Sequence, residues 1–245
     1  MRIAEATAST VSDLWTQLKP RVENSQYLEK AAQELASALH RQFDESVVIA
    51  RVFVTVRFDA LPESNREFVL KLAQSAGAAE DLKPATPVLS LIGSHGQEED
   101  WNDRRKSKGH VGIPLISSSF VGSIPMISRL LQELGVPLDW ADSHDTEIIV
   151  QTLDGTQGLF FVEDAGQATD QEGRKIIAAQ DFVSSYDVKS VFGTGGVYPD
   201  GQMIVVVVFC RDSFAKSEAE HFLALTQSFK GETTSLAGSA AVFAE

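Results

Sequence analysis

The chain has 245 residues, of which 43% are hydrophobic and 22% are charged, and this composition is typical of a globular domain with a substantial core. Its 34 acidic residues outnumber its 21 lysines and arginines, and the resulting net charge of −13 disfavours binding to nucleic acid and to anionic membranes. The single cysteine, Cys210, excludes an intramolecular disulfide and zinc sites built from several cysteines.

The N-terminal sequence lacks the basic start and the apolar stretch of a signal peptide. The longest apolar run, residues 203–210, is too short to span a bilayer. We therefore expect a cytoplasmic protein.

The first half of the chain begins with helical patterns. Apolar residues recur at helical spacing over 11–18, and Pro20 interrupts this pattern. A second helical pattern over 25–43 predicts a long amphipathic helix. Alternating apolar residues over 47–58 predict a strand with one buried face. A short helix over 65–74 and a short strand over 88–92 follow.

Residues 93–112 are polar and rich in glycine, with neither a helical nor a strand period. Such a long irregular segment inside a compact domain is usually functional or mobile. Beyond it, the pattern predicts a strand over 113–116 and a helix over 120–134, with Gly135 at the position of a left-handed cap.

The last third of the chain is rich in strands. Strands over 147–153 and 159–163 flank an Asp-Gly turn, and a second hairpin joins 189–197 to 202–209 through Tyr-Pro-Asp-Gly. A short helix over 179–185 lies between these hairpins, and a final helix covers 217–229. We predict an α+β fold whose mainly antiparallel sheet of five or six strands is flanked by helices. Its predicted organisation is an N-terminal helical extension (1–24), a single domain (25–230) and a flexible tail (231–245).

Three segments carry a resemblance to a known family. The stretch KSVFGTGGVYPDGQMIVVVVFCRDSFAKSEAEHFLALTQSF resembles the closing hairpin and helix of GAF domains, and SVVIARVFV resembles their leading strand. The segment GSHGQEEDWNDRRKSKGHVGIPL is similar to one in GAF-like sensory regions of bacterial two-component proteins. The resemblance covers 25–230 in outline and implies a GAF-like (profilin-like) fold. It also implies a sensory or regulatory module that binds a small molecule, pairs as a homodimer through its terminal helices and acts through a signalling partner.

The sequence departs from the GAF subfamilies with known ligands. The asparagine-lysine, phenylalanine and aspartate-glutamate signature of cyclic-nucleotide binders is missing. Bilin-binding domains commonly carry a cysteine followed by histidine, whereas Cys210 is followed by Arg211. The methionine sulfoxide reductases of this fold use several cysteines. The ligand and any cofactor therefore stay unassigned.

The segment from Trp101 to His110 contains the most distinctive candidate site. An aromatic ring, an amide, a guanidinium, a hydroxyl and an imidazole could converge there on a small polar or anionic ligand. The alternative is that Trp101 anchors the loop while the charged groups face water. The glycines around Thr194 are more typical of a strand bulge than of a phosphate loop, yet they could open space for a ligand. The candidate ligand-binding residues are Trp101, Asn102, Arg104, Ser107, His110 and Thr194.

Other chemistries have weaker support in the sequence. The five histidines lack the HExxH spacing of a metalloprotease, although His95, His110 and His144 could meet in space. No nucleophile-elbow motif accompanies a serine. We therefore expect neither catalytic residues nor a metal site. A small-molecule enzyme using His110 with Arg104, and an interaction module that binds no ligand, are the alternatives.

Overall fold

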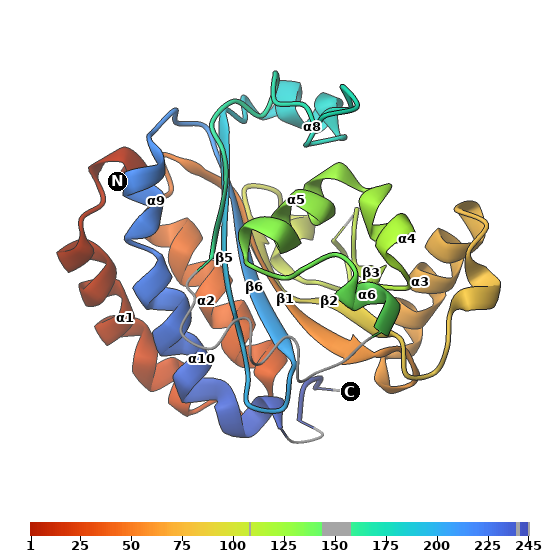
Figure 1. Cartoon of the computed structure of the whole chain (residues 1–245). Coiled ribbons are helices and arrows are strands. Elements are labelled where there is room, and N and C mark those ends of the chain that lie inside the picture. The colour runs from red at the N-terminus through yellow and green to blue at the C-terminus, as the bar shows by residue number, and fades with distance from the viewer. Residues whose placement is uncertain (108, 144–157, 239–240, 245) are drawn as a thin grey trace.

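Two long hydrophobic strands lie at the centre of a single sheet in the computed structural model, which describes residues 1–107, 109–143, 158–238 and 241–244 (Figure 1). The six strands are all antiparallel and follow the order β3-β2-β1-β6-β5-β4. This arrangement confirms the predicted fold class. The strands are β1 (Val47–Arg57), β2 (Pro87–Gly96), β3 (Gly112–Pro114), β4 (Leu159–Val162), β5 (Ser190–Val197) and β6 (Met203–Cys210).

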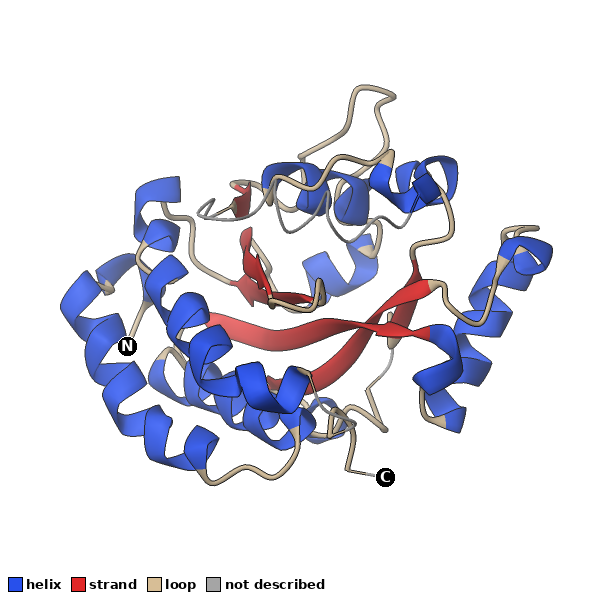
Figure 2. Ribbon diagram, turned by 60° about the horizontal axis from the view of Figure 1, so that its bottom comes forward, coloured by secondary structure: helices blue, strands red, loops and turns tan. Residues whose placement is uncertain are grey.

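Strand β6 reads MIVVVVFC and is buried along nearly its whole length, because helices and loops cover both of its faces. The alternation in β1 divides its side chains between the two faces. Ala50, Val52 and Val54 join the core beneath one layer of helices, and Phe53 joins the core on the opposite face. The two cores lie on opposite faces of the sheet, and helices cover both faces (Figure 2).

One face of the sheet is covered by the terminal helices, which lie side by side (Figure 1). The predicted helix over 25–43 is confirmed as α2, and the helix near the N-terminus continues through Pro20 instead of stopping there. Proline lacks only one backbone donor, and Val11, Leu14, Leu18 and Val22 keep the helix anchored in the core. The helices of this layer are α1 (Ala8–Glu23), α2 (Leu28–Gln42), α3 (Glu63–Ser75), α9 (Lys216–Glu220) and α10 (Leu223–Ala237).

The opposite face carries shorter helices. The predicted helix over 120–134 is two helices, because Pro125 starts a new one at its first position. Gly135 adopts a φ of 88°, the left-handed conformation expected at its cap. The helices of this layer are α4 (Ser118–Gly122), α5 (Pro125–Glu133), α6 (Trp140–Ser143) and α8 (Gln180–Ser185).

The two ends of the chain pack more closely than the predicted organisation implies. The predicted flexible tail begins at residue 231, yet α10 continues to Ala237, and Val242 and Phe243 are buried in the helix-layer core. The N-terminal extension likewise packs against α2 and α10 as part of that core. The predicted strand over 147–153 and His144 lie outside the described residues. No helix in the described ranges is long and apolar enough to cross a membrane.

A segment wrapped around the edge of the sheet

The segment after β2, described over 97–107 and 109–111 and called the wrapped segment below, wraps around the free edge of that strand. Strand β3 pairs with β2 only over Val88–Ser90, so the rest of the β2 edge needs other partners. The side-chain amide of Gln33, from α2, supplies them at Ser94: its Nε2 donates to the Ser94 carbonyl (2.8 Å), and its Oε1 accepts from the Ser94 N–H (3.2 Å). Gln33 also donates to the Asn102 carbonyl, and Asn102 Oδ1 accepts from Gly96 N. Asn102 therefore fixes the segment to the sheet edge.

Strand β2 itself is longer than predicted. The first four residues of the expected irregular segment, 93–96, continue the strand to Gly96. Gly93 is required there, because a Cβ at that position would lie 2.5 Å from the backbone of Ala32 in α2. The close approach of strand and helix brings Gln33 within reach of the sheet edge.

Arg104 turns from this segment toward the helix layer. Its side chain is 1% exposed; its Nε lies 3.1 Å from Glu29 Oε1, and its Nη2 donates to Glu29 Oε2 at 3.1 Å. Its Nη1 donates to Asn65 Oδ1 of α3. The exposed neighbour Arg105 also reaches Glu29, at 3.0 Å. Burial raises the pKa of Glu29, but the bonds from Arg104 and from the Ala244 N–H outweigh it, so this pKa lies below its usual value.

The C-terminal segment, residues 241–244, meets the same carboxylate. The N–H groups at the start of α2 donate to its backbone, Leu28 to the Ala241 carbonyl at 2.8 Å and Glu29 to the Val242 carbonyl at 2.9 Å. Ala244 N donates to Glu29 Oε2 at 3.0 Å. The Phe243 ring lies under the Arg104 guanidinium, 4.9 Å from its centre. One buried carboxylate thus holds both the wrapped segment and the C-terminal segment.

Arg51 lies on the opposite face of the sheet, beneath the later part of the wrapped segment. It pairs with Val207 of β6, whose side chain belongs to the core of that face. Its Nη2 donates to Ser107 Oγ at 2.9 Å, and burial lowers the pKa of Arg51 to about 10. His110 is accessible to solvent. Partial burial lowers the pKa of His110, and the charge of Arg51 lowers it further.

Ser94 lies directly opposite Arg51 in the register of β1 and β2. Residues paired in this way share a face of the sheet, with their Cβ atoms about 5 Å apart. The Ser94 hydroxyl is fully buried and has no hydrogen-bond partner among the described residues. Two residues along the strand, the Trp101 indole packs on Gly96 and against Tyr186, with ring centroids 4.8 Å apart.

The structure gathers only some of the six residues predicted to bind a ligand. Trp101, Ser107 and His110 lie over the face that carries Arg51, whereas Asn102 is bound at the edge and Arg104 lies among the helices. Thr194 belongs elsewhere: its hydroxyl lies 2.6 Å from that of Thr226 in α10, under the helix layer. The six residues therefore do not form one site.

Arg51 and Ser94 were not among the predicted site residues. The sequence signal for Arg51 is a cation in the mainly apolar part of a strand, which is equally typical of a sheet edge. Ser94 has no signal of its own, because its importance depends on the register with β1.

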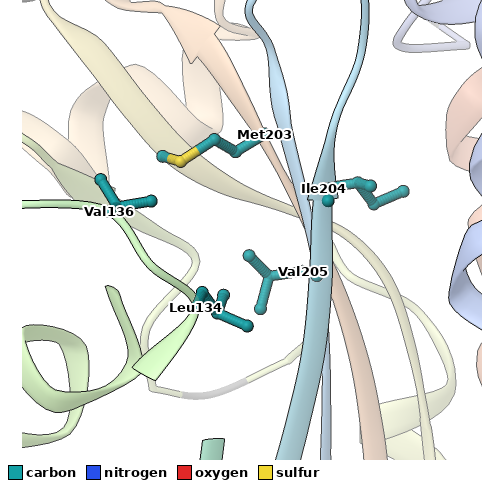
Figure 3. Close-up of a pocket in the computed structure, with 7 residues that line it drawn as sticks. Leu134, Val136, Met203, Ile204 and Val205 are labelled. Atoms are coloured by element: carbon teal, nitrogen blue, oxygen red, sulfur yellow. The ribbon is translucent and has the colours of Figure 1, made fainter. Parts of the chain in front are cut away.

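A small cavity lies further along the same sheet face. It measures about 10 Å³, room for about one water molecule, and is lined by Leu134, Val136, Met203, Val205 and the backbone of neighbouring residues. Figure 3 shows Met203 and Val205 extending toward the Leu134–Val136 turn, whereas Ile204 points to the opposite side of the strand. Its apolar walls offer no charged group to a polar ligand.

Metal and thiol chemistry have little support in the described ranges. No group of three or more histidine, cysteine or acidic side chains there could hold a metal ion. His95 instead packs against His40, with ring centroids 5.1 Å apart. Cys210 is fully buried, and burial raises the pKa of its thiol, so it is poorly suited to act as a nucleophile.

Comparison with known proteins finds similarity in structure alone. No protein-family model and no curated protein sequence matches the chain. Among solved structures, the GAF domain of a phosphoenolpyruvate-protein phosphotransferase from Coxiella burnetii aligns with a TM-score of 0.51 and 11% identity, over 97% of this chain and 100% of that one. The phycoerythrobilin-bound GAF domain of a cyanobacterial phytochrome aligns with a TM-score of 0.45 and 8% identity, over 93% and 96% of the two chains.

The alignment with the Coxiella domain spans nearly the whole of both chains, and the strand order and flanking helices give a sheet covered on both faces. The chain therefore has a GAF-like fold. At 11% identity the likeness concerns the fold, and function has to be argued from the residues.

Proposed function

We propose that this chain is a sensory or regulatory module that binds a small molecule beneath the wrapped segment and acts through a partner protein. The observation that carries the proposal is the shared carboxylate of Glu29. It receives Arg104 and Arg105 from the wrapped segment, and it also receives the Ala244 N–H from the C-terminal segment. A change in one segment therefore alters the surroundings of the other.

The coupling works through the population of two arrangements. A ligand that holds the wrapped segment in place keeps Arg104 on Glu29, and the C-terminal segment then stays docked on α2. A ligand that shifts the segment withdraws Arg104 and weakens the contacts of Phe243 and Ala244. Either change presents a different surface to a partner, provided that the ligand binds one arrangement more tightly than the other.

The coupling is tested by hydrogen exchange followed by mass spectrometry. Because coupling is reciprocal, a variant that ends at residue 240 should exchange faster in the peptide covering 97–107. Glu29→Gln should speed exchange in both segments. Glu34→Gln is the matched control: Glu34 lies on the same helix, but its ion pair with Arg21 is exposed. Unchanged exchange in 97–107 after truncation would contradict the proposal.

We propose binding and not catalysis for this site. The enzyme alternative pairs His110 with Arg104, yet Arg104 is engaged by Glu29 and Asn65, and His110 instead lies near the charge of Arg51. Assays against carboxylic and phosphoric esters test this directly. A turnover that His110→Ala abolishes would favour the enzyme.

A further inference from the structure

We propose that Arg51, Ser94 and Ser107 form a site for the carboxylate or phosphate group of a small molecule, with His110 at its entrance. This inference rests on the proposed function for its regulatory meaning, because it names the class of ligand that the module binds. The site itself is defined by the side chains on the sheet face opposite the terminal helices.

The guanidinium of Arg51 provides the positive charge. It projects from the middle of β1, between β2 and β6, and its Nη2 donates to the Ser107 hydroxyl. A guanidinium presents parallel N–H donors whose spacing matches the two oxygens of a carboxylate or a phosphate. Burial strengthens such a bond, because less water competes for the ligand.

Ser94 provides an independent indication of a ligand. Its hydroxyl is fully buried, and no described residue hydrogen-bonds to it. A buried hydroxyl without a partner costs stability, so native proteins rarely retain one without a reason. Since Ser94 shares its face with Arg51 across the strand pair, an anion on the guanidinium can accept the Ser94 proton.

The guanidinium lies beneath an exposed stretch of the wrapped segment. Gly109 has a φ of 101°, and a Cβ placed on it would lie only 3.6 Å from Arg51 Nη1, so the backbone runs directly over the charge. Gly109 and His110 are both exposed. The imidazole of His110 is therefore placed to donate a hydrogen bond to the outer part of a bound anion.

The net charge of −13 means that an anion is expected to bind at Arg51 and not elsewhere on the surface. Over most of the surface, the negative charge repels anions. We therefore expect the ligand to be a small molecule whose acidic group enters the site. The apolar side chains and the Trp101 indole on the same face suit an apolar or planar remainder of the ligand.

The site is tested by isothermal titration of the full chain with inorganic phosphate and, separately, with acetate, against sodium chloride at equal ionic strength. Arg51→Met should reduce the affinity about a hundredfold or more. Ser94→Ala should reduce it about tenfold, the effect of one hydrogen bond to a charged group, without lowering the melting temperature of the ligand-free protein. Arg51→Lys tests the fork geometry in a variant that keeps the charge.

Ser37→Ala is the matched control. The Ser37 hydroxyl is also buried without a partner in the described ranges, but it lies on α2 in the helix layer. Its removal should leave the affinity within about twofold of wild type. Binding of phosphate alone or of acetate alone identifies which acidic group the site prefers. Absence of binding by both anions, or equal binding by wild type and Arg51→Met, would overturn the site.

The two proposals fail in different ways. Hydrogen exchange in 241–244 is measured with and without the anion that binds. If an anion binds in an Arg51-dependent way but this exchange does not change, the anion site is supported and the regulatory coupling is contradicted. Faster exchange of 97–107 in the truncated variant is measured without any anion. That result can therefore support the coupling even if the anion site is refuted.

Discussion

Arg104 and Glu29 form an ion pair that is withdrawn from solvent, with Nε 3.1 Å from Oε1 and side chains that are 1% and 5% exposed. The pair joins the wrapped segment to α2, and both groups have further partners. Such a pair contributes to stability mainly because breaking it strands a charge in the interior.

Arg104→Met should therefore lower the free energy of unfolding by about 3 kcal/mol, since it leaves the buried Glu29 carboxylate with Arg105 as its charged partner in the described ranges, beside the Ala244 N–H. Urea denaturation measures this loss. Arg57→Met is the control, because its pair with Asp59 is exposed, and it should change stability by less than about 1 kcal/mol. Equal losses in the two variants would contradict this account of the buried pair.

The His40–His95 pair should make the protein sensitive to acid. Burial, then His40 and Arg41, lower the pKa of His95 to about 4. Burial also lowers the pKa of His40, where Arg211 and Arg41 oppose the effect of Asp44. Both imidazoles are thus neutral in the fold but take up protons near pH 6.5 when unfolded. Their contribution is complete above pH 6.5 and is lost as the pH falls toward 4.

Chemical denaturation at pH 7.0 and pH 4.5 measures the loss. Acidic side chains also titrate in this range, so the comparison is with His95→Asn, which lacks one of the two imidazoles. The wild type should lose more stability than His95→Asn, by about 1 to 2 kcal/mol. If both lose the same amount, His95 does not titrate as inferred.

Thr194 should prove structural. Thr194→Val leaves the Thr226 hydroxyl buried without its partner, so we expect a loss of about 1 to 3 kcal/mol. Thr226→Val should cost a similar amount, and the double variant should cost clearly less than the sum of the two. A double-mutant cycle in urea measures this coupling. Titration with phosphate should be unaffected, and a weakened affinity would return Thr194 to the ligand site.

The homodimer through the terminal helices stays a prediction, and the packing of α1 changes how it can be tested. Val11, Leu14, Leu18 and Val22 are buried against neighbouring elements of the same chain. Deleting residues 1–24 removes several such side chains, each worth about 1.5 to 3 kcal/mol, and should abolish cooperative thermal unfolding. A deletion variant that still melts cooperatively would show that α1 is dispensable. Sedimentation velocity of the intact chain measures the oligomeric state.

Local patterns predicted most of the elements. Alternation along β1 and the Tyr-Pro-Asp-Gly turn are physical signals within a few residues, and the corresponding strand and hairpin are confirmed. The break at Pro125 and the continuation through Pro20 depend instead on packing. A proline is tolerated where tertiary contacts hold the helix, and the sequence around it does not reveal those contacts.

The site was harder to predict because its groups are brought together over long distances in sequence. Arg104 and Glu29 are 75 residues apart, so the sequence does not show that they pair. Without that partner, the basic run that contains Arg104 predicts a solvated or ligand-binding surface. Ser94 faces Arg51 only in the observed register, and a shift by one residue would place it on the other face of the sheet. The sequence shows the chemistry of each residue, but it does not show which distant residue lies beside it in the fold.

The central strand pair also has a consequence for the time that the chain needs to fold. Strand β6 lies beside β1, and the bond from Met203 N to Thr55 Oγ1 closes 148 residues of chain. The β5–β6 hairpin closes only a short turn and can form early. Because long closures cost entropy before they are rewarded by contacts, docking of that hairpin on β1 sets the pace of folding. Until it occurs, the apolar faces of β6 stay open to other chains, and a newly made chain is most prone to aggregate then.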